Sequence, residues 1–252
     1  MKRLFRPAEL LDVIVPPQGG LDFLSCRRLE LGGGGAVVHV ESGQEEVVLV
    51  CIAGSVDYDL GGVLAGAAEC KDMLYLPRGN AATLSTAGSA VVMRIGAPSS
   101  HDTACAHIRF SEIAGSKRHS VFGSASDNSL RDVYMYIDDS FDAQRLLVGI
   151  GQGRPGGWTV WPPHEHGDEK EELYVYFDMD GGFGIQCLYE SLDDASCFLV
   201  REGDAVAVPR GFHPNAGCPG GRISYVYAMA ARNPGERSFM ALRFQEEFGD
   251  AF

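Results

Sequence analysis

Short apolar or alternating runs, each closed by Gly, Pro, Asp or Asn, recur along the chain. Runs of about four to eight residues with this spacing are typical of β-strands. The pattern predicts strands at residues 47–53, 73–76, 90–95, 133–137, 146–150, 173–177, 184–189, 205–208 and 223–229. Helical spacing is weak and occurs only at residues 8–13 and 238–248. We therefore expect an all-β sandwich or barrel.

Two stretches of the chain repeat the same three elements in the same order. In each, one strand opens with two Glu, a second strand ends in Pro-Arg-Gly, and an apolar strand closes the unit. The Glu pairs lie at 45–46 and 171–172, and the Pro-Arg-Gly turns lie at 77–79 and 209–211. Such a repeat indicates a duplicated structural unit. We expect two tandem β-barrels, residues 1–118 and 119–252, joined within the Ser- and Gly-rich segment 111–127.

The second copy contains histidines that the first copy lacks. His164 and His166 precede its Glu pair, and His213 follows its Pro-Arg-Gly turn. Asn80 follows the corresponding turn of the first copy. In an extended strand, residues two positions apart share a face, so His164 and His166 can supply two nitrogens to one ion. We expect His213 to bring a third nitrogen from another strand.

The same parity selects a glutamate as the fourth ligand. Glu172 shares a face with Tyr174 and Tyr176. We therefore prefer it to Glu171 as the inward-facing carboxylate. Three His nitrogens and one carboxylate suit a divalent Zn, Mn, Fe, Co or Ni ion, with a position left open for substrate. We expect the first barrel to be degenerate, keeping the Glu but binding no metal.

Composition narrows the class of protein. The chain has 252 residues, enough for one or two domains, and its 34 Asp+Glu against 21 Lys+Arg give a net charge of -13. This charge repels phosphate backbones, so we expect no nucleic-acid partner. No run approaches about 18 apolar residues, and the basic start lacks an apolar signal region. We therefore expect a cytoplasmic protein without membrane contact.

Cysteine usage bears on the kind of scaffold. The chain has seven Cys, an odd number, and none of them forms a CxxC pair. This pattern indicates free thiols rather than a disulfide framework or a structural zinc site.

The motifs of the second copy resemble those of the cupin superfamily. The first comprises His164-x-His166 with Glu172 downstream, and the second is Gly203-x5-Pro209-x-Gly211-x-His213. With the duplication, the resemblance implies a bicupin. It would consist of two tandem cupin barrels of the double-stranded β-helix or jelly-roll type, the N-terminal one degenerate.

Residues 157–230 resemble the 5-deoxy-glucuronate isomerase family of inositol catabolism more narrowly. The matching motifs are Pro162-Pro163-His164-x-His166, Glu171-Glu172-x-Tyr174-x-Tyr176, Gly182-Phe183-Gly184-x-Gln186-x-x-Tyr189 and Pro209-x-Gly211-Phe212-His213-Pro214. The resemblance implies a metal-dependent aldose–ketose isomerase that converts 5-deoxy-glucuronate, a sugar acid, into 2-deoxy-5-keto-gluconate. The proton would move between adjacent carbons through an enediol, which a metal stabilises.

The group that moves the proton is left open by the sequence. The candidate catalytic residues are Glu172, Tyr174 and Gln186, with Glu172 expected to be a metal ligand. Glu171, Tyr174, Tyr176 and a hydroxide on the metal are the candidates for the base. Gln186 could orient substrate or a water, or it could make a structural hydrogen bond between strands.

The substrate carboxylate requires a cation, and Arg offers bidentate geometry. Four residues are candidates: Arg131, Arg154, Arg210 and Arg222.

Two other functions remain open. A cupin dioxygenase would place a redox metal on the same ligand set, and a non-catalytic cupin would only bind sugar. Exposed barrel faces and edge strands favour a homo-oligomer in every case.

Overall fold

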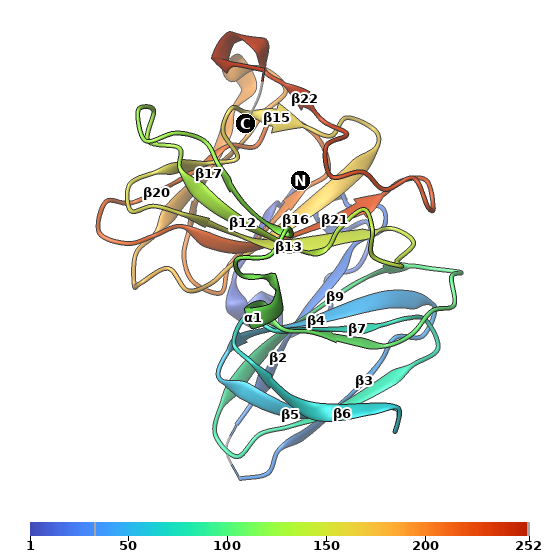
Figure 1. Cartoon of the computed structure of the whole chain (residues 1–252). Helices are drawn as coiled ribbons and strands as arrows, with labels where there is room; N and C mark the ends of the chain where they lie inside the picture. The colour runs from blue at the N-terminus through green and yellow to red at the C-terminus, as the bar shows by residue number, and fades with distance from the viewer. Residues whose placement is uncertain (33, 251–252) are drawn as a thin grey trace.

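The computed structural model describes residues 1–32 and 34–250, so residues 251–252 of the expected second domain lie outside the described chain. Nearly all of its regular structure is β-strand, arranged as two stacked barrels (Figure 1). The nine strands predicted from apolar runs are confirmed, with boundaries shifted by up to three residues. The expected all-β class is thereby confirmed.

The first barrel combines two sheets. Its five-stranded sheet has the order β10-β7-β4-β9-β2, and its four-stranded sheet has the order β3-β8-β5-β6. These strands are β2 (Ser25–Leu31), β3 (Val37–Glu41), β4 (Glu45–Ala53), β5 (Ser55–Leu60), β6 (Leu64–Glu69), β7 (Met73–Leu76), β8 (Ala81–Ser85), β9 (Ala90–Pro98) and β10 (Ala106–Ile108). The side chains between the two sheets form an apolar core of their own.

The second barrel has a seven-stranded sheet, β1-β19-β16-β21-β13-β12-β11, opposite a four-stranded sheet, β14-β20-β17-β18. A two-stranded ribbon, β15-β22, lies at its mouth. The strands are β1 (Leu4–Phe5), β11 (His119–Phe122), β12 (Arg131–Ile137), β13 (Leu146–Gly153), β14 (Trp158–Thr159), β15 (His164–Glu165), β16 (Lys170–Tyr176), β17 (Gly184–Leu188), β18 (Ser196–Val200), β19 (Ala205–Val208), β20 (Asn215–Gly217), β21 (Ser224–Ala231) and β22 (Arg243–Phe244).

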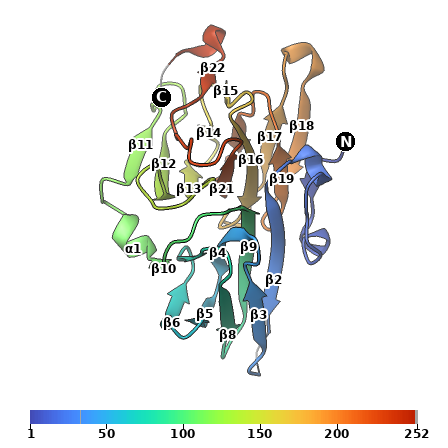
Figure 2. The same ribbon diagram turned by 90° about the vertical axis from the view of Figure 1, so that its right-hand side faces the viewer.

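Two segments of the chain connect the barrels. The expected linker, residues 111–127, contains most of the short helix α1 (Phe110–Ile113) and the edge strand β11. The chain also begins beside the second barrel, where β1 pairs with β19 (Figure 2). The N-terminal residues therefore complete the sheet of the C-terminal barrel.

A third apolar core lies between the barrels. It joins side chains of β4, such as Val48 and Val50, to side chains of β16 and β21, such as Leu173 and Val226. The outer faces of the two large sheets are thus packed against each other. Strands buried on both faces appear as continuous apolar runs, which explains why the strongest strand predictions fell on these elements.

Two buried carboxylates tie the barrels together reciprocally. Glu171 of the second barrel accepts hydrogen bonds from the backbone N–H groups of residues 22–24, at 2.6 to 2.9 Å. Glu46 of the first barrel accepts them from the N–H groups of residues 144–146, at 2.5 to 2.9 Å. Each carboxylate therefore holds the segment that leads into a strand of the other barrel.

Neither of the two weak helix predictions is correct. Residues Pro7–Glu9 form one 3-10 turn, and the chain then continues to Ile14, which pairs with Cys26. The tail contains β22 and the 3-10 turn Glu246–Phe248 instead of a helix. Further 3-10 turns occur at Gln18–Gly20 and Leu192–Asp194. Both predicted segments are short. Leu10 packs into the core between the barrels and Phe239 against the core of the second barrel, so tertiary packing overrides weak local periodicity.

None of the helices in residues 1–32 and 34–250 has the length and apolar character required to cross a bilayer.

Candidate metal centre and active-site cavity

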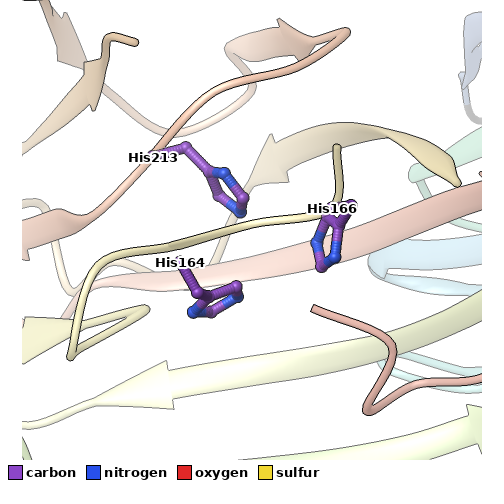
Figure 3. A group of neighbouring side chains, drawn as sticks. All are labelled: His164, His166 and His213. Atoms are coloured by element: carbon purple, nitrogen blue, oxygen red, sulfur yellow. The ribbon is translucent and has the colours of Figure 1, made fainter. Parts of the chain in front are cut away.

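Three histidines meet inside the second barrel. His164 begins β15, His166 follows that strand, and His213 lies in the loop between β19 and β20. One nitrogen from each ring lies within 4.8 Å of the others, and all three side chains are buried. Figure 3 shows the rings converging on a common space. A cluster of this kind can hold a metal ion.

A glycine shapes the loop that carries His213. Gly211 has a φ of 94°, a conformation that favours glycine. A Cβ at this position would lie 2.7 Å from the carbonyl oxygen of Tyr189. The Pro-Arg-Gly turn of the repeat is therefore the local reason why His213 points into the barrel.

Glu172 lies against two of the histidines. Its Oε2 is 3.2 Å from Nε2 of His166 and 3.1 Å from Nε2 of His213, and its side chain is buried. Burial opposes ionisation of Glu172, but hydrogen bonding by the adjacent His166 imidazole outweighs it and lowers the pKa of the carboxyl group. Glu171 points to the opposite face of β16, as its contacts with residues 22–24 show. The parity of the strand thus places Glu172, and not Glu171, beside the histidines.

Backbone carbonyls orient two of the imidazole rings. Nδ1 of His213 lies 2.8 Å from the carbonyl oxygen of Gly211, and Nδ1 of His164 lies 3.3 Å from that of Pro162. A carbonyl only accepts, so Nδ1 carries the proton in both rings. The Nε2 lone pairs are then directed into the cluster, as in the outer shell of metal-binding histidines.

The protonation states of the histidines are those required to bind a cation. Burial lowers the pKa of His164 well below its ordinary value and lowers the pKa of His166 as well, which keeps both rings neutral. Among the described residues, Nδ1 of His166 and Nε2 of His213 are buried without a hydrogen-bond partner. Orphaned lone pairs beside a carboxylate fit a bound metal ion.

The cluster opens into a mostly apolar cavity. Its walls include the aromatic rings of Tyr174, Tyr225 and Tyr227, together with Phe122 and Met229. The rings of Tyr174 and Tyr225 pack edge to face with centroids 4.9 Å apart. A concave, aromatic site with a few polar groups is the usual form of a small-molecule site.

Arg131 contributes a positive charge to the same cavity. Its side chain is buried, and its guanidinium lies 5.7 Å from the ring centroid of Phe122. Burial lowers the pKa of Arg131, but an arginine keeps its charge in proteins. The other candidates lie outside this cavity: Arg154 pairs with Asp132, Arg222 with Asp180, and Arg210 lies near Asp168. Of the four candidates, Arg131 is therefore the one that lines the cavity.

Tyr174 also lines the cavity, two residues after Glu172 on β16. Its side chain is buried beside Glu172. Burial, reinforced by the charge of Glu172, raises the pKa of Tyr174 well above its ordinary value. The phenol therefore keeps its proton and can donate it in a hydrogen bond.

Gln186 supports the cluster from outside the cavity. Its Oε1 accepts hydrogen bonds from the Tyr176 hydroxyl and from Nδ2 of Asn215. Its Nε2 donates to the carbonyl oxygens of His213 and Cys187. Of the two roles considered for Gln186, the structure favours the structural hydrogen bond between strands, because these contacts occupy the amide and fix the His213 segment.

The C-terminal segment closes the cavity, a role that the sequence pattern did not indicate. Phe239 and Leu242 contribute to the cavity wall, and β22 places Phe244 opposite His164. The buried ammonium of Lys170 donates to the carbonyl oxygens of Ser238 and Ala241, which holds this segment in place. The apolar residues of the tail were the available signal, but their helical interpretation concealed their role.

The first barrel lacks the glutamate that the repeat was expected to retain. Val47 pairs with Leu76, the residue before the first Pro-Arg-Gly turn. Glu172 pairs with Val208, the residue before the second turn. The structural counterpart of Glu172 is therefore Val47, and the two Glu pairs are offset by one position. A one-residue offset moves a side chain to the opposite face of a strand. Glu46 therefore does not occupy the position of Glu172, and the expectation that the first barrel keeps this glutamate is wrong.

The remaining histidines have local partners away from the cavity. These contacts are His39 with Thr83, His101 with Asp142, His107 with Asp72 and Tyr58, and His119 with Asp132.

The chain is similar in sequence to proteins that are named uronate isomerases. Over 171 residues, the chain is 29% identical to 4-deoxy-L-threo-5-hexosulose-uronate ketol-isomerase 2 of Rhizobium meliloti, covering 66% of this chain and 58% of that protein. It is 29% identical over 209 residues to 5-deoxy-glucuronate isomerase of Shouchella clausii, covering 75% of this chain and 74% of that protein. The alignment thus spans little more than half of the first relative.

Solved structures share the fold. An IolB-like protein from Salmonella typhimurium superposes with a TM-score of 0.81 at 21% identity, covering 98% of both chains. The oxalate decarboxylase of Lactobacillus farciminis gives a TM-score of 0.65 at 10% identity, covering 93% of this chain and 87% of the other. At these identities the likeness shows a shared bicupin architecture.

The profile described as the KduI/IolB family matches residues 5–246, nearly the whole chain. The relatives above carry the names of ketol-isomerases and isomerases. The chain therefore belongs to the KduI/IolB family.

Proposed function

We propose that this protein is a metal-dependent aldose–ketose isomerase of deoxy-uronic acids, with 5-deoxy-glucuronate as substrate and 2-deoxy-5-keto-gluconate as product. The main observation in support is that one cavity is lined both by His164 and His166 of the buried three-histidine cluster and by the buried cation Arg131. A uronic acid has a carboxylate at one end and a carbonyl at the other, so it needs both groups. The names of the relatives support a uronate as the substrate class.

His164, His166, His213 and Glu172 are the residues that would hold the metal. A divalent Zn, Mn, Fe, Co or Ni ion fits this donor set. When bound, the metal supplies Lewis-acid stabilisation of the enediolate. The carbonyls of Gly211 and Pro162 orient two of the rings, and the hydrogen bonds of Gln186 fix the backbone at His213.

Arg131 is the residue that we assign to the substrate carboxylate. A guanidinium can form two parallel hydrogen bonds with a carboxylate, which fixes orientation as well as position. The low polarity around Arg131 strengthens this attraction. Charge pairing at Arg131 would thus direct the opposite end of the substrate toward the histidines.

We assign proton transfer to Tyr174 acting together with Glu172. The phenol oxygen of Tyr174 would accept the proton from the substrate carbon as its own hydroxyl proton passes to the Glu172 carboxylate, and the reverse transfer would deliver a proton to the adjacent carbon. Of the candidates for the base, Glu171 points to the interface between the barrels, and Tyr176 donates its hydroxyl hydrogen to Gln186. Tyr174 lines the cavity and holds its proton at Oη beside Glu172. Phe239 and Leu242 close the cavity and exclude water from the transfer.

The test is direct conversion of substrate. Metal-replete protein is incubated with 5-deoxy-glucuronate, and NMR follows loss of the aldehyde proton and appearance of the ketose. A chelator-treated sample is the control, and 4-deoxy-L-threo-5-hexosulose-uronate is run in parallel because relatives are named for it. We expect metal-dependent conversion of 5-deoxy-glucuronate.

Other results would change the assigned substrate or the assigned activity. Conversion of the hexosulose-uronate alone would keep the isomerase and replace the substrate. Oxygen consumption without isomerisation would favour the dioxygenase, and tight binding without turnover by metal-loaded protein would favour a sugar-binding cupin.

A further inference from the structure

Two cysteines face each other on the outer sheet of the second barrel. Cys187 on β17 and Cys197 on β18 are direct partners in the antiparallel register. Their Sγ atoms lie 3.4 Å apart, and both are reduced. Cys197 is exposed and Cys187 is half-buried, so the pair is accessible from solvent.

The backbone at this pair is suited to a cross-link. The N–H of Cys187 donates to the carbonyl of Pro214, away from β18. Cys187 and Cys197 therefore form a non-hydrogen-bonded pair, the type in which Cα atoms of antiparallel strands approach to about 4.5 Å. Disulfides span Cα separations of about 4.4 to 6.8 Å. A bond between these sulfurs requires rotation of side chains and little movement of the strands.

We propose that Cys187 and Cys197 are a reversible redox modification site that forms an intramolecular disulfide. The oxidant is a small-molecule disulfide such as oxidised glutathione. The Cys197 thiolate attacks one glutathione sulfur and releases the first glutathione thiolate. The Cys187 thiol then loses its proton and attacks Sγ of Cys197, which releases the second. Two protein thiols are oxidised, and one glutathione disulfide is reduced to two thiols.

Exposure sets the order of the two attacks. Burial, with a further contribution from Cys197, raises the pKa of the Cys187 thiol to about 12. The thiolate is the attacking species, so the exposed Cys197 reacts first. Cys187 then reacts because the mixed disulfide holds the target sulfur beside it.

The cross-link would close a loop on the wall that carries His213. Residues 188–196 lie between the two cysteines and include Tyr189, which pairs with Phe212 and donates to Gln245. Gln186, next to Cys187, donates to the carbonyl of His213. Oxidation therefore restrains a part of the barrel that supports both the His213 loop and the C-terminal segment.

The test detects the disulfide between Cys187 and Cys197 directly, so it does not depend on the proposed isomerase activity. The full-length protein is incubated with oxidised glutathione, alkylated without reduction, digested and analysed by mass spectrometry. We expect a peptide pair linked through Cys187 and Cys197, loss of two free thiols, and reversal by dithiothreitol. The melting temperature should rise by about 5 °C on oxidation, because the bridge restricts the unfolded chain.

Matched variants identify the pair. Cys218→Ser removes another partly accessible thiol and should leave the linked peptide unchanged. Cys197→Ser should abolish the link and the rise in melting temperature. Stable glutathione adducts on Cys187 or Cys197 without a link, or links to other cysteines, would overturn the proposal. The wild-type peptide map decides the question even if a variant does not fold.

Discussion

The carboxylate of Glu172 and the neighbouring imidazoles direct more lone pairs than N–H protons into the buried space between them. Since Nδ1 of His213 donates to the backbone, its Nε2 directs a lone pair toward Oε2 of Glu172, 3.1 Å away. Two acceptors at this separation repel each other, and a buried unpaired acceptor costs about 1–3 kcal/mol. A divalent cation between them would convert both into ligands. This electrostatic argument supports a metal independently of any relative.

The first prediction concerns metal binding by His164, His166 and His213. Loss of an outer-shell partner already weakens metal binding by about 10–100-fold, so loss of a ligand should weaken it more. His164→Ala, His166→Ala and His213→Ala should each retain little metal by mass spectrometry after dialysis. His39→Ala, on the exposed β3–β8 pair of the first barrel, should retain a full complement. Full occupancy in all three cavity variants would refute the assigned centre.

The hydroxyl of Tyr174 makes the second prediction. Tyr174→Phe removes the hydroxyl and preserves the ring that packs on Tyr225. Because general acid–base groups contribute about 10²- to 10⁴-fold, kcat should fall by at least about 100-fold with metal content unchanged. Tyr134→Phe, on β12 outside the cavity, is the control and should be active. A normal kcat for Tyr174→Phe would remove it from the mechanism.

The charge of Arg131 makes the third prediction. Hydrogen bonds to charged groups contribute about 1.5–3 kcal/mol, which corresponds to about 10- to 150-fold in affinity. Arg131→Met should therefore raise KM for the uronate by that factor, with a smaller change in kcat. Arg222→Met removes a surface arginine that pairs with Asp180 and should leave KM unchanged. Steady-state kinetics of both variants checks the assignment, and equal KM values would contradict it.

At the scale of elements, strand β16 serves two cores at once. Its alternate residues Glu172, Tyr174 and Tyr176 face the interior of the second barrel, and Leu173 and Val175 face the first barrel. Glu171 lies on the second of these faces and holds residues 22–24. One strand thereby positions the active site and the interface between the barrels.

The reciprocal contacts of Glu171 and Glu46 make a prediction at this scale. Glu171→Gln removes the charge and sets an amide N–H₂ against three backbone donors. We expect each of Glu171→Gln and Glu46→Gln to lower the free energy of unfolding by about 1.5–3 kcal/mol, measured by urea denaturation. Glu202→Gln, an exposed position, should change it little. Changes no larger than the control would show that these contacts contribute little to stability.

At the scale of the molecule, the shared core makes the two barrels interdependent. The core between the large sheets draws side chains from both halves of the chain. β1 adds a strand from the N-terminus to the sheet of the second barrel. A barrel separated from its partner would expose a wide apolar face, which in monomers marks an interface or an aggregation hazard.

This interdependence predicts a single unfolding transition. Both Trp residues, Trp158 and Trp161, belong to the second barrel, so their fluorescence reports on that barrel alone. Far-UV circular dichroism reports on both. We expect coincident urea transitions by the two probes, and we expect a fragment of residues 119–250 to be aggregation-prone. Separate midpoints, or a stable monomeric fragment, would contradict a shared core.

The sequence by itself determined what depends on short-range order. Apolar runs and their closing residues located the strands that build the two large sheets, because strands buried on two faces carry an unmistakable apolar signal. Strand parity also predicted that His164 and His166 share a face and that Glu172, rather than Glu171, faces inward. The sequence pattern did not predict β5 and β18. β5 alternates with polar residues on an exposed face, and β18 is a short strand that is largely exposed.

The tertiary structure decided what depends on contacts between distant residues. The pairing of β4 with β7 and of β16 with β19 showed that Val47, and not a Glu, corresponds to Glu172. Only the folded barrel distinguished Arg131 from three other arginines and brought the tail over the cavity. Local periodicity contains no information on register or on which surface covers another, because both are set by the packing of whole sheets.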